Sequence, residues 1–340
     1  MRQRRRDLIT SATSLREAKG VAAAVIFAAI QGGALYLAAL ADSARWLPGE
    51  STGLLEHPGM MSIVLANALL PIVASHAKSM TCKLGQKFPS SNPALVKRYY
   101  KLAVLKHAFG KEVFWLFFVL SSIAGFCYLV NQTVVLRNPN EYTDYYGHDT
   151  FDTATHVWSF YVSRPVLFIS WVIVIPWFAA TLLAHVVAVS TLLARAKREG
   201  WASFYVPHPD RCGGYSVFGW ADVWYAIGIA IVLVETVLII MTHHKATVGN
   251  GIAIVGITVG ALVISLFSAI PALKTVWRQR TLLNSKSVLR LRHGGQLDQE
   301  SCVVLFNVRF IPYTETAVRL AVGTRILITA TYGLSSWALS

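Results

Sequence analysis

Apolar residues along this chain come in long blocks rather than in the short periodic patterns of water-soluble strands and helices. Six blocks are each long enough to cross the hydrocarbon core of a bilayer as an α-helix, at 1.5 Å per residue. They cover residues 21–41, 58–77, 113–136, 164–194, 222–242 and 250–273. The pattern predicts an all-α fold, a polytopic bundle of six transmembrane helices.

Composition supports a membrane protein. Of the 340 residues, 54% are hydrophobic and only 14% are charged. Soluble domains carry about 25% charged residues, so this chain has too few charges to cover a water-exposed surface of its size.

The basic residues indicate an orientation. Lys and Arg number 31 against 17 Asp and Glu, and they gather in every second connecting segment. The basic segments are the N-terminus, 78–111, 195–221 and the chain after Lys274. The positive-inside rule therefore predicts that both termini lie in the cytoplasm. Because the excess sits beside apolar blocks, it does not indicate a nucleic-acid partner.

This orientation divides the chain into three parts. Residues 1–20 form a basic cytoplasmic N-terminus, 21–273 the transmembrane domain, and 274–340 a cytoplasmic C-terminal region. An apolar stretch near the end contains Arg319 and Arg325. As a seventh span it would place Arg325 in the bilayer, which costs at least about 2.5 kcal/mol unless the charge is paired. We expect a helix packed at the cytoplasmic face, with a seventh span as the alternative.

The fourth block is longer than a bilayer requires. From Arg164 to Ala194 it would measure roughly 46 Å as one helix, against a hydrocarbon core of about 30 Å. Pro176 lies near its middle and predicts a kink there, because proline removes a backbone donor.

Polar residues inside the apolar blocks are the strongest functional candidates. Gln31, Asn67, His185 and Glu235 lie on the first, second, fourth and fifth blocks. Counted from the cytoplasmic ends, all four fall at a depth of roughly 13–20 Å and are predicted to form one polar layer.

Glu235 is the most informative member of the layer, because a carboxylate in hydrocarbon must be paired, protonated or turned toward protein or water. His185 is its candidate partner. Two interpretations stay open. The layer is either interhelical hydrogen bonding around a neutral Glu235 or a path for protons or ions. Gly228, about two turns from Glu235 on the same face, allows a neighbouring helix to come close.

The loop between the fourth and fifth blocks contains "HPDRCGG". One interpretation is a tight turn, in which Asp210 caps the backbone and Gly213 and Gly214 permit positive φ. The other is a functional cytoplasmic loop, in which His208 titrates near neutral pH and Arg211 attracts anions.

This region resembles a group of uncharacterised bacterial multi-pass inner-membrane proteins with an HPDxxGG cytoplasmic loop. The resemblance covers residues 159–219 and rests on "SFYVSRPVLF", "LLARAKREGW" and "HPDRCGGYSVFG". Those proteins usually continue Gly-Gly-Leu-Gly-Phe-Leu, whereas this chain reads Gly213-Gly214-Tyr215-Ser216-Val217-Phe218. The resemblance implies a bacterial inner membrane and no particular activity.

A metal site is a weaker hypothesis. Cys82, Cys212 and Cys302 fall on predicted cytoplasmic segments, and His208 lies near Cys212; together they would suit Zn²⁺. The ligands come singly rather than in close pairs, so no cofactor is expected. Metalloprotease, Walker A, GxSxG and dinucleotide-binding signatures are absent from the sequence, which argues against an enzyme.

The sequence thus favours a membrane protein that passes or gates an ion or small solute, as a homo-oligomer in the lipid bilayer. The alternative is a membrane-embedded sensor, scaffold or effector whose basic cytoplasmic face binds a protein partner. An intramembrane enzyme using Glu235 and His185 is the third hypothesis.

Overall fold

The computed structural model describes residues 20–38, 40, 58–87, 108–135, 163–199, 215–243, 248–292 and 315–337. Regular structure within these residues is helical throughout, which confirms the all-α prediction for them. The first helix is Gly20–Ala38. The later elements are α2 (Pro58–Lys87), α4 (Ala108–Val135), α7 (Ser163–Ile169), the π-helix η3 (Ser170–Val174), α8 (Ile175–Arg198), α9 (Ser216–His243), α10 (Val248–Arg292) and α12 (Glu315–Trp337).

Each predicted apolar block falls on a helix or, for the fourth, on the continuous run of α7, η3 and α8. By length and composition, four helical stretches can cross a membrane: Gly20–Ala38, Met61–Thr81, Pro165–Ala196 and Ser216–Leu238. Two further apolar stretches within the described residues are shorter, Glu112–Cys127 and Gly251–Leu266. The protein is therefore a helical membrane protein by these features.

The outer faces of the helices are apolar. Ile30 and Ile252 are 65% and 67% exposed, and other large side chains such as Leu37, Leu116 and Val263 also point outward. Contiguous exposed apolar surface of this kind suits lipid rather than water.

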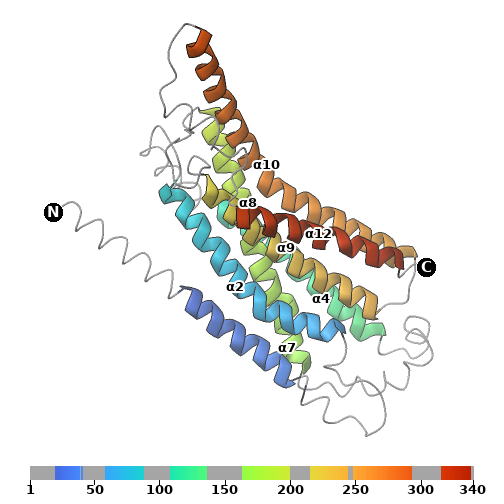
Figure 1. The fold of residues 1–340 in the computed structure, drawn as a ribbon. Coiled ribbons are helices and arrows are strands. Elements are labelled where there is room, and N and C mark those ends of the chain that lie inside the picture. The colour runs from blue at the N-terminus through green and yellow to red at the C-terminus, as the bar shows by residue number, and fades with distance from the viewer. Residues whose placement is uncertain are drawn as a thin grey trace, which may run out of the picture.

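Helix α9 is the central element of the bundle (Figure 1). It packs against α2, α8, α10 and α12, while α4 lies at the edge and packs on α8 and η3. Helices α2 and α9 run antiparallel, as do α8 and α9 (Figure 1). We call the end where α8 finishes and α9 starts the α8–α9 end, and the opposite end the α9–α10 end. Helix α10 continues well past the other helices at the α8–α9 end (Figure 1).

The fourth block is deformed just before Pro176. The Ile175 N–H donates to the carbonyl of Ser170, five residues earlier, and this widens the helix into the π-turn η3. Pro176 has no N–H to continue an α-helical ladder, so the deformation lies where the sequence predicted a kink.

Helix α12 lies lengthwise on α9 and α10. Ala317 packs near Val223, and Ile328 packs near Leu233 and Ile254, so α12 runs parallel to α9. Its 23 residues extend about 34 Å, enough to follow the bundle for most of its thickness.

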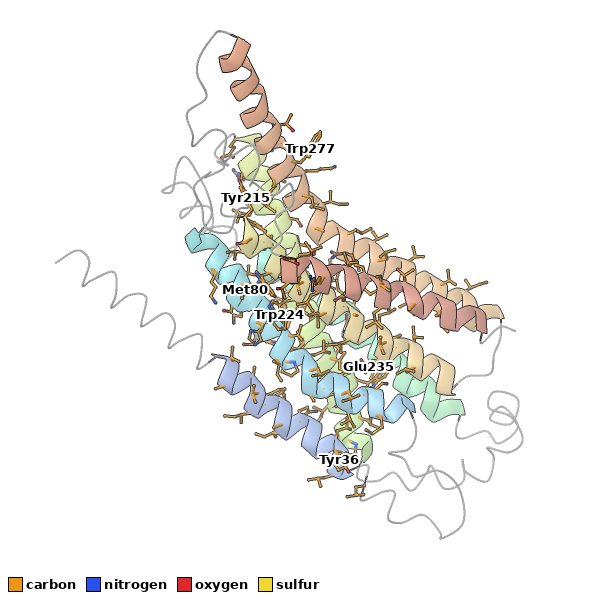
Figure 2. All side chains as sticks on the ribbon, in the orientation of Figure 1. Tyr36, Met80, Tyr215, Trp224, Glu235 and Trp277 are labelled. Carbon is orange, nitrogen blue, oxygen red and sulfur yellow. The ribbon has the colours of Figure 1, made fainter. Side chains whose placement is uncertain are left out.

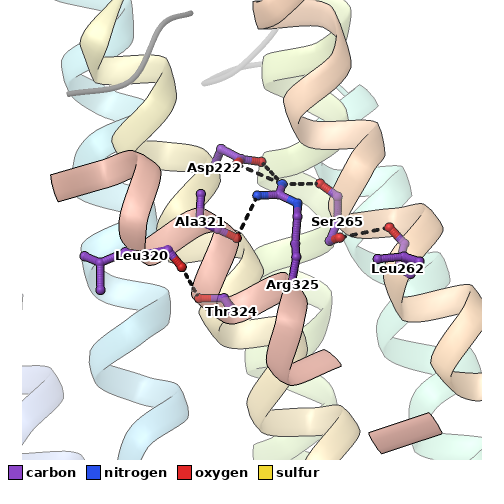
Figure 3. A network of polar contacts seen from close by, with 7 residues as sticks. All are labelled: Asp222, Leu262, Ser265, Leu320, Ala321, Thr324 and Arg325. Atoms are coloured by element: carbon purple, nitrogen blue, oxygen red, sulfur yellow. Dashed lines mark hydrogen bonds and ion pairs between the residues drawn. The ribbon is translucent and has the colours of Figure 1, made fainter. Parts of the chain in front are cut away.

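A buried ion pair joins α12 to the bundle (Figure 3). Arg325 Nη2 donates to both carboxylate oxygens of Asp222, at 3.0 and 2.9 Å, and to the Ser265 carbonyl of α10 at 2.9 Å. The side chains of Arg325 and Asp222 are only 17% and 2% exposed. One guanidinium thus connects α12, α9 and α10, and its charge is neutralised inside the bundle.

We expect Arg325→Met to destabilise the protein by about 3–5 kcal/mol, because it leaves the Asp222 carboxylate buried without its partner. The double variant Asp222→Leu with Arg325→Met should recover most of that loss, since an apolar pair of similar volume replaces both charges. Thermal unfolding in detergent measures both effects.

Arg319→Met is the matched control. Arg319 pairs with Glu315 on the exposed face of α12, where the two side chains are 78% and 69% exposed, so its removal should change stability little. Equal melting temperatures for the Arg325 and Arg319 variants would refute a structural role for the buried pair.

Candidate functional site

Two of the predicted layer residues lie on the facing surfaces of α2 and α9. On α2, a stripe at three- and four-residue spacing is buried along its whole length: Asn67, Leu70, Ala74, Ala77 and Thr81. Asn67 is 0% exposed and continues this stripe toward the α9–α10 end.

The facing stripe of α9 runs from Tyr225 through Gly228 and Val232 to Glu235, again at three- and four-residue spacing. Glu235 is 3% exposed, so it lies inside the bundle and not against lipid (Figure 2). This agrees with the expectation from the energetic cost of a lipid-facing acid.

A hydrogen bond between the Thr81 and Tyr225 hydroxyls fixes the register of the two helices. Counted from it at 1.5 Å per residue, Pro71 on α2 and Glu235 on α9 both lie about 15 Å toward the α9–α10 end. Asn67 lies one turn, about 6 Å, beyond Pro71. The carboxyl is therefore level with the proline, and the asparagine is its neighbour along α2.

The polar atoms at this level are hydrogen-bond acceptors without donors. Asn67 Nδ2 donates to the Ile63 carbonyl of its own helix at 2.9 Å, while Asn67 Oδ1 is buried and unpartnered. Glu235 Oε1 is likewise buried and unpartnered. Pro71 has no N–H, so the main-chain carbonyl of Asn67, four residues earlier, lacks its α-helical donor. We call Asn67, Pro71 and Glu235 the acceptor site.

Gln31 is placed one layer further out, between the first helix and η3. Its Nε2 donates to the Ser170 hydroxyl at 3.1 Å, and Ser170 is fully buried. Next to it, Gly32 lies so close to Ala68 that a Cβ would come within 3.2 Å of the Ala68 Cβ. The Gln31 side chain thus has a partner inside the bundle, and this hydrogen bond joins the first helix to the π-turn.

His185 is not level with Glu235. Leu182 of α8 lies directly against Gly228, where a Cβ would overlap its Cδ1. Since α8 and α9 are antiparallel, His185 is then level with Tyr225, about 15 Å from Glu235 along the bundle. The four predicted layer residues therefore do not share one level: His185 lies nearer the α8–α9 end than Glu235. Counting residues from the ends of the apolar blocks placed the two at the same depth, but the packing of α8 on α9 shifts His185 along the bundle.

The level nearer the α8–α9 end has its own polar groups. His185 is half-buried, and by the same count the Thr81–Tyr225 hydrogen bond is at its level. Between this level and the acceptor site, the Leu182 side chain fills the space over Gly228. An apolar barrier therefore separates two polar levels.

Burial continues to the start of α9. Tyr215, directly before α9, is 0% exposed, and burial raises the pKa of its phenol above the ordinary value. Its ring packs with Phe218, 5.6 Å between centroids, and closes the α8–α9 end of the core.

The remaining sequence candidates fall outside the described residues. These are the loop residues His208, Asp210, Arg211, Gly213 and Gly214, together with Cys212 and Cys302; of Cys82, only the backbone in α2 is described. Among the described residues, no group of three or more His, Cys, Asp or Glu side chains is arranged to hold a metal ion.

Comparison with known proteins adds no identity. No protein-family model matches the chain, and neither curated proteins nor solved structures give a significant match. The resemblance over residues 159–219 stays a prediction.

Several site features were not predicted from the sequence. The Asp222–Arg325 and Thr81–Tyr225 pairs each join residues more than a hundred positions apart, which one sequence cannot match. The signal for Pro71 was present, because a proline inside an apolar block frees a carbonyl four residues earlier.

The π-turn depends on a close backbone approach at Gly125 of α4. A Cβ at Gly125 would overlap the carbonyl oxygen of Trp171 in η3. The Ser122 hydroxyl, one turn away on α4, is buried and unpartnered. Only a glycine lets α4 lie against the deformed turn at this distance.

Gly125→Ala should therefore destabilise the protein by about 1–3 kcal/mol, the usual effect of overpacking, because backbone and not a flexible side chain must move. Gly33→Ala is the control, since nothing lies within 4 Å of a Cβ at Gly33. Thermal melting in detergent should separate the two variants; a Gly125 variant as stable as the Gly33 variant would contradict the close approach.

Proposed function

We propose that the protein passes, or gates the passage of, a proton or small cation across a membrane through the acceptor site. The observation that carries the proposal is the buried Glu235 carboxyl with an unpartnered oxygen, level with Pro71 and one turn from the unpartnered amide oxygen of Asn67. Buried acceptors without donors are unfavourable, and a proton or cation relieves that cost.

Hydrogen bonding that only holds helices together would pair these groups with each other. The Asn67 amide is the donor available on the facing stripe, yet it donates to its own helix at Ile63. Elsewhere the bundle does pair its polar groups between helices, as Gln31 with Ser170 and Thr81 with Tyr225. Ser122 Oγ and Arg325 Nε are also buried without a partner, but Arg325 is paired through Nη2 and Ser122 carries no charge. The Glu235 carboxyl can gain or lose a proton, which favours a functional interpretation of the acceptor site.

The apolar barrier at Leu182 supports gating. Polar groups lie on both sides of it, at the acceptor site and around His185, and Leu182 contacts Gly228 through a flexible side chain. A rotamer change at Leu182 would join the two levels without moving a helix.

A sensor, scaffold or effector is the second candidate, favoured by the extension of α10. This helix carries exposed Lys274, Trp277 and Arg278 where it leaves the bundle (Figure 2). Its basic surface would suit a cytoplasmic protein partner or anionic lipid. We also propose that the protein forms a homo-oligomer and lies in a bacterial inner membrane.

We further propose seven spans rather than six, with α12 crossing beside α9 and the N-terminus cytoplasmic. Support comes from the lengthwise packing of α12 and from the paired Arg325, which removes the penalty that disfavoured a seventh span. The chain would then end on the outer side of the membrane.

The topology is tested by single cysteines in a variant whose four native cysteines are replaced by serine. We expect Ser340→Cys to react with a membrane-impermeant maleimide on intact cells, and Ser285→Cys, in the α10 extension, to stay protected until the cells are lysed. Protection at both positions would restore the six-span arrangement, with α12 on the cytoplasmic side.

The function is tested by flux into proteoliposomes under imposed H⁺, Na⁺ or K⁺ gradients. We expect the parent protein to pass at least one of these ions and Glu235→Gln to abolish that flux, because the amide keeps the shape but can neither release a proton nor carry charge. Glu315→Gln removes an exposed carboxylate on α12 and is the control, expected to match the parent. Absence of any ion flux, or parent-like flux from Glu235→Gln, would end the proposal.

A further inference from the structure

We infer that the ion is a proton, held on the Glu235 carboxyl and hydrogen-bonded to the oxygens that α2 presents around Pro71. The inference rests on the proposed function and names its substrate. The oxygens are the main-chain carbonyl of Asn67, which Pro71 leaves without a helical donor, and the Asn67 side-chain Oδ1, which is unpartnered.

One hydrogen satisfies this arrangement. When a proton binds, an O–H bond forms on Glu235, the carboxylate becomes neutral, and one acceptor becomes a donor facing acceptors. When the proton leaves, the O–H bond breaks and its electron pair stays on the carboxylate. No oxidation, reduction or further reactant is involved.

The geometry of α2 directs its oxygens toward Glu235. Helix carbonyls point toward the C-terminal end, so the Asn67 carbonyl points to the level of Pro71, which is also the level of Glu235. The bond from Asn67 Nδ2 to the Ile63 carbonyl fixes the amide and leaves Oδ1 free. Asn67 thus offers two acceptors to the Glu235 hydrogen, its main-chain carbonyl and its side-chain Oδ1.

A metal cation fits the site less well. Hard cations take about six or more oxygen ligands. The facing stripes of α2 and α9 offer at this level only the oxygens of Asn67 and Glu235, because the neighbouring stripe positions are the apolar Leu70, Ala74 and Val232. A proton needs one donor oxygen and one acceptor.

Glu235 is 3% exposed, so its carboxyl is shielded from solvent. On α9 itself, Asp222 is about 20 Å away and paired with Arg325 of α12. The charged groups on the described parts of α2, α8, α10 and α12 lie nearer the α8–α9 end: Lys78 and Lys83 of α2, Arg195 and Arg198 of α8, Lys274 and Arg278 of α10, and Glu315 and Arg319 of α12, as do His76 and His185. Toward the α9–α10 end lie two groups that are neutral at ordinary pH, Tyr36 of the first helix (Figure 2) and Cys127 of α4.

Pro71→Ala separates two effects, because the substitution should preserve or raise the stability of the protein while it lowers H⁺ flux. Alanine restores the N–H that the Asn67 carbonyl lacks, so the helix should be as stable as the parent or more stable. The same N–H occupies the acceptor that receives the Glu235 hydrogen. We therefore expect H⁺ flux to fall by about tenfold, the factor that one hydrogen bond is worth.

Asn67→Asp tests the same site through its pH profile. A second carboxyl one turn from Glu235 raises the proton affinity of the pair, since two neighbouring carboxylates repel. The pH at which H⁺ flux is half-maximal should move up by about one unit. An unchanged pH profile in the folded variant would show that position 67 does not lie beside the group that carries the proton.

Both variants are measured in proteoliposomes with a pH-sensitive dye inside, the membrane potential clamped by K⁺ and valinomycin, and folding checked by thermal melting. The expected results are H⁺ flux in the parent, reduced flux in folded Pro71→Ala, and an upward shift in Asn67→Asp. Flux of Na⁺ or K⁺ but not H⁺ through Glu235 would overturn the proton while leaving the proposed function intact. Parent-like H⁺ flux from Pro71→Ala together with an unshifted pH profile in Asn67→Asp would overturn the site.

Discussion

Hydrocarbon offers no hydrogen bonds, so every polar group that enters the bundle needs a partner from the protein. The fold depends on how that requirement is met at each level. Arg325 meets it through Asp222 and the Ser265 carbonyl, and this brings a third helix against α9 and α10. Without that pairing, α12 could not lie lengthwise against the apolar core, because a lone guanidinium there would be strongly unfavourable.

The same requirement separates structural polar groups from the candidate functional ones. Gln31 binds Ser170 and joins the first helix to the π-turn, and Thr81 binds Tyr225 and sets the register of α2 on α9. Those hydrogen bonds give a structural role to the polar groups that form them. The acceptor site differs, because Asn67 Oδ1 and Glu235 Oε1 are both buried without a donor. Under the proposed function, a bound proton supplies the missing donor, and the Leu182 side chain beside Gly228 lies between this site and the other polar level.

The sequence predicted the all-helical membrane character of the fold, because long apolar blocks determine membrane helices almost independently of their neighbours. By length and composition, four of the described helical stretches can cross a membrane, against six predicted spans. The sequence also singled out Glu235, whose cost in lipid is a local property. It did not predict the partners: His185 was matched to Glu235 by depth, but the packing of Leu182 on Gly228 places His185 one level away. It predicted a kink at Pro176 but not the π-turn, which depends on the contact with Gly125 of another helix. The position of α12 depends on the pairing of Arg325 with Asp222, a contact between distant residues that one sequence does not reveal.

The proposed site requires that the buried Glu235 carboxyl bind a proton inside the bundle. Infrared spectroscopy of the purified protein tests it directly, because the carbonyl stretch of a protonated carboxyl is resolved from carboxylate and amide bands. We expect a protonated-carboxyl band at neutral pH, where a free glutamate is ionised, and its loss in Glu235→Gln. A parent spectrum with no such band, or one that Glu235→Gln leaves unchanged, would show that Glu235 does not hold the proton.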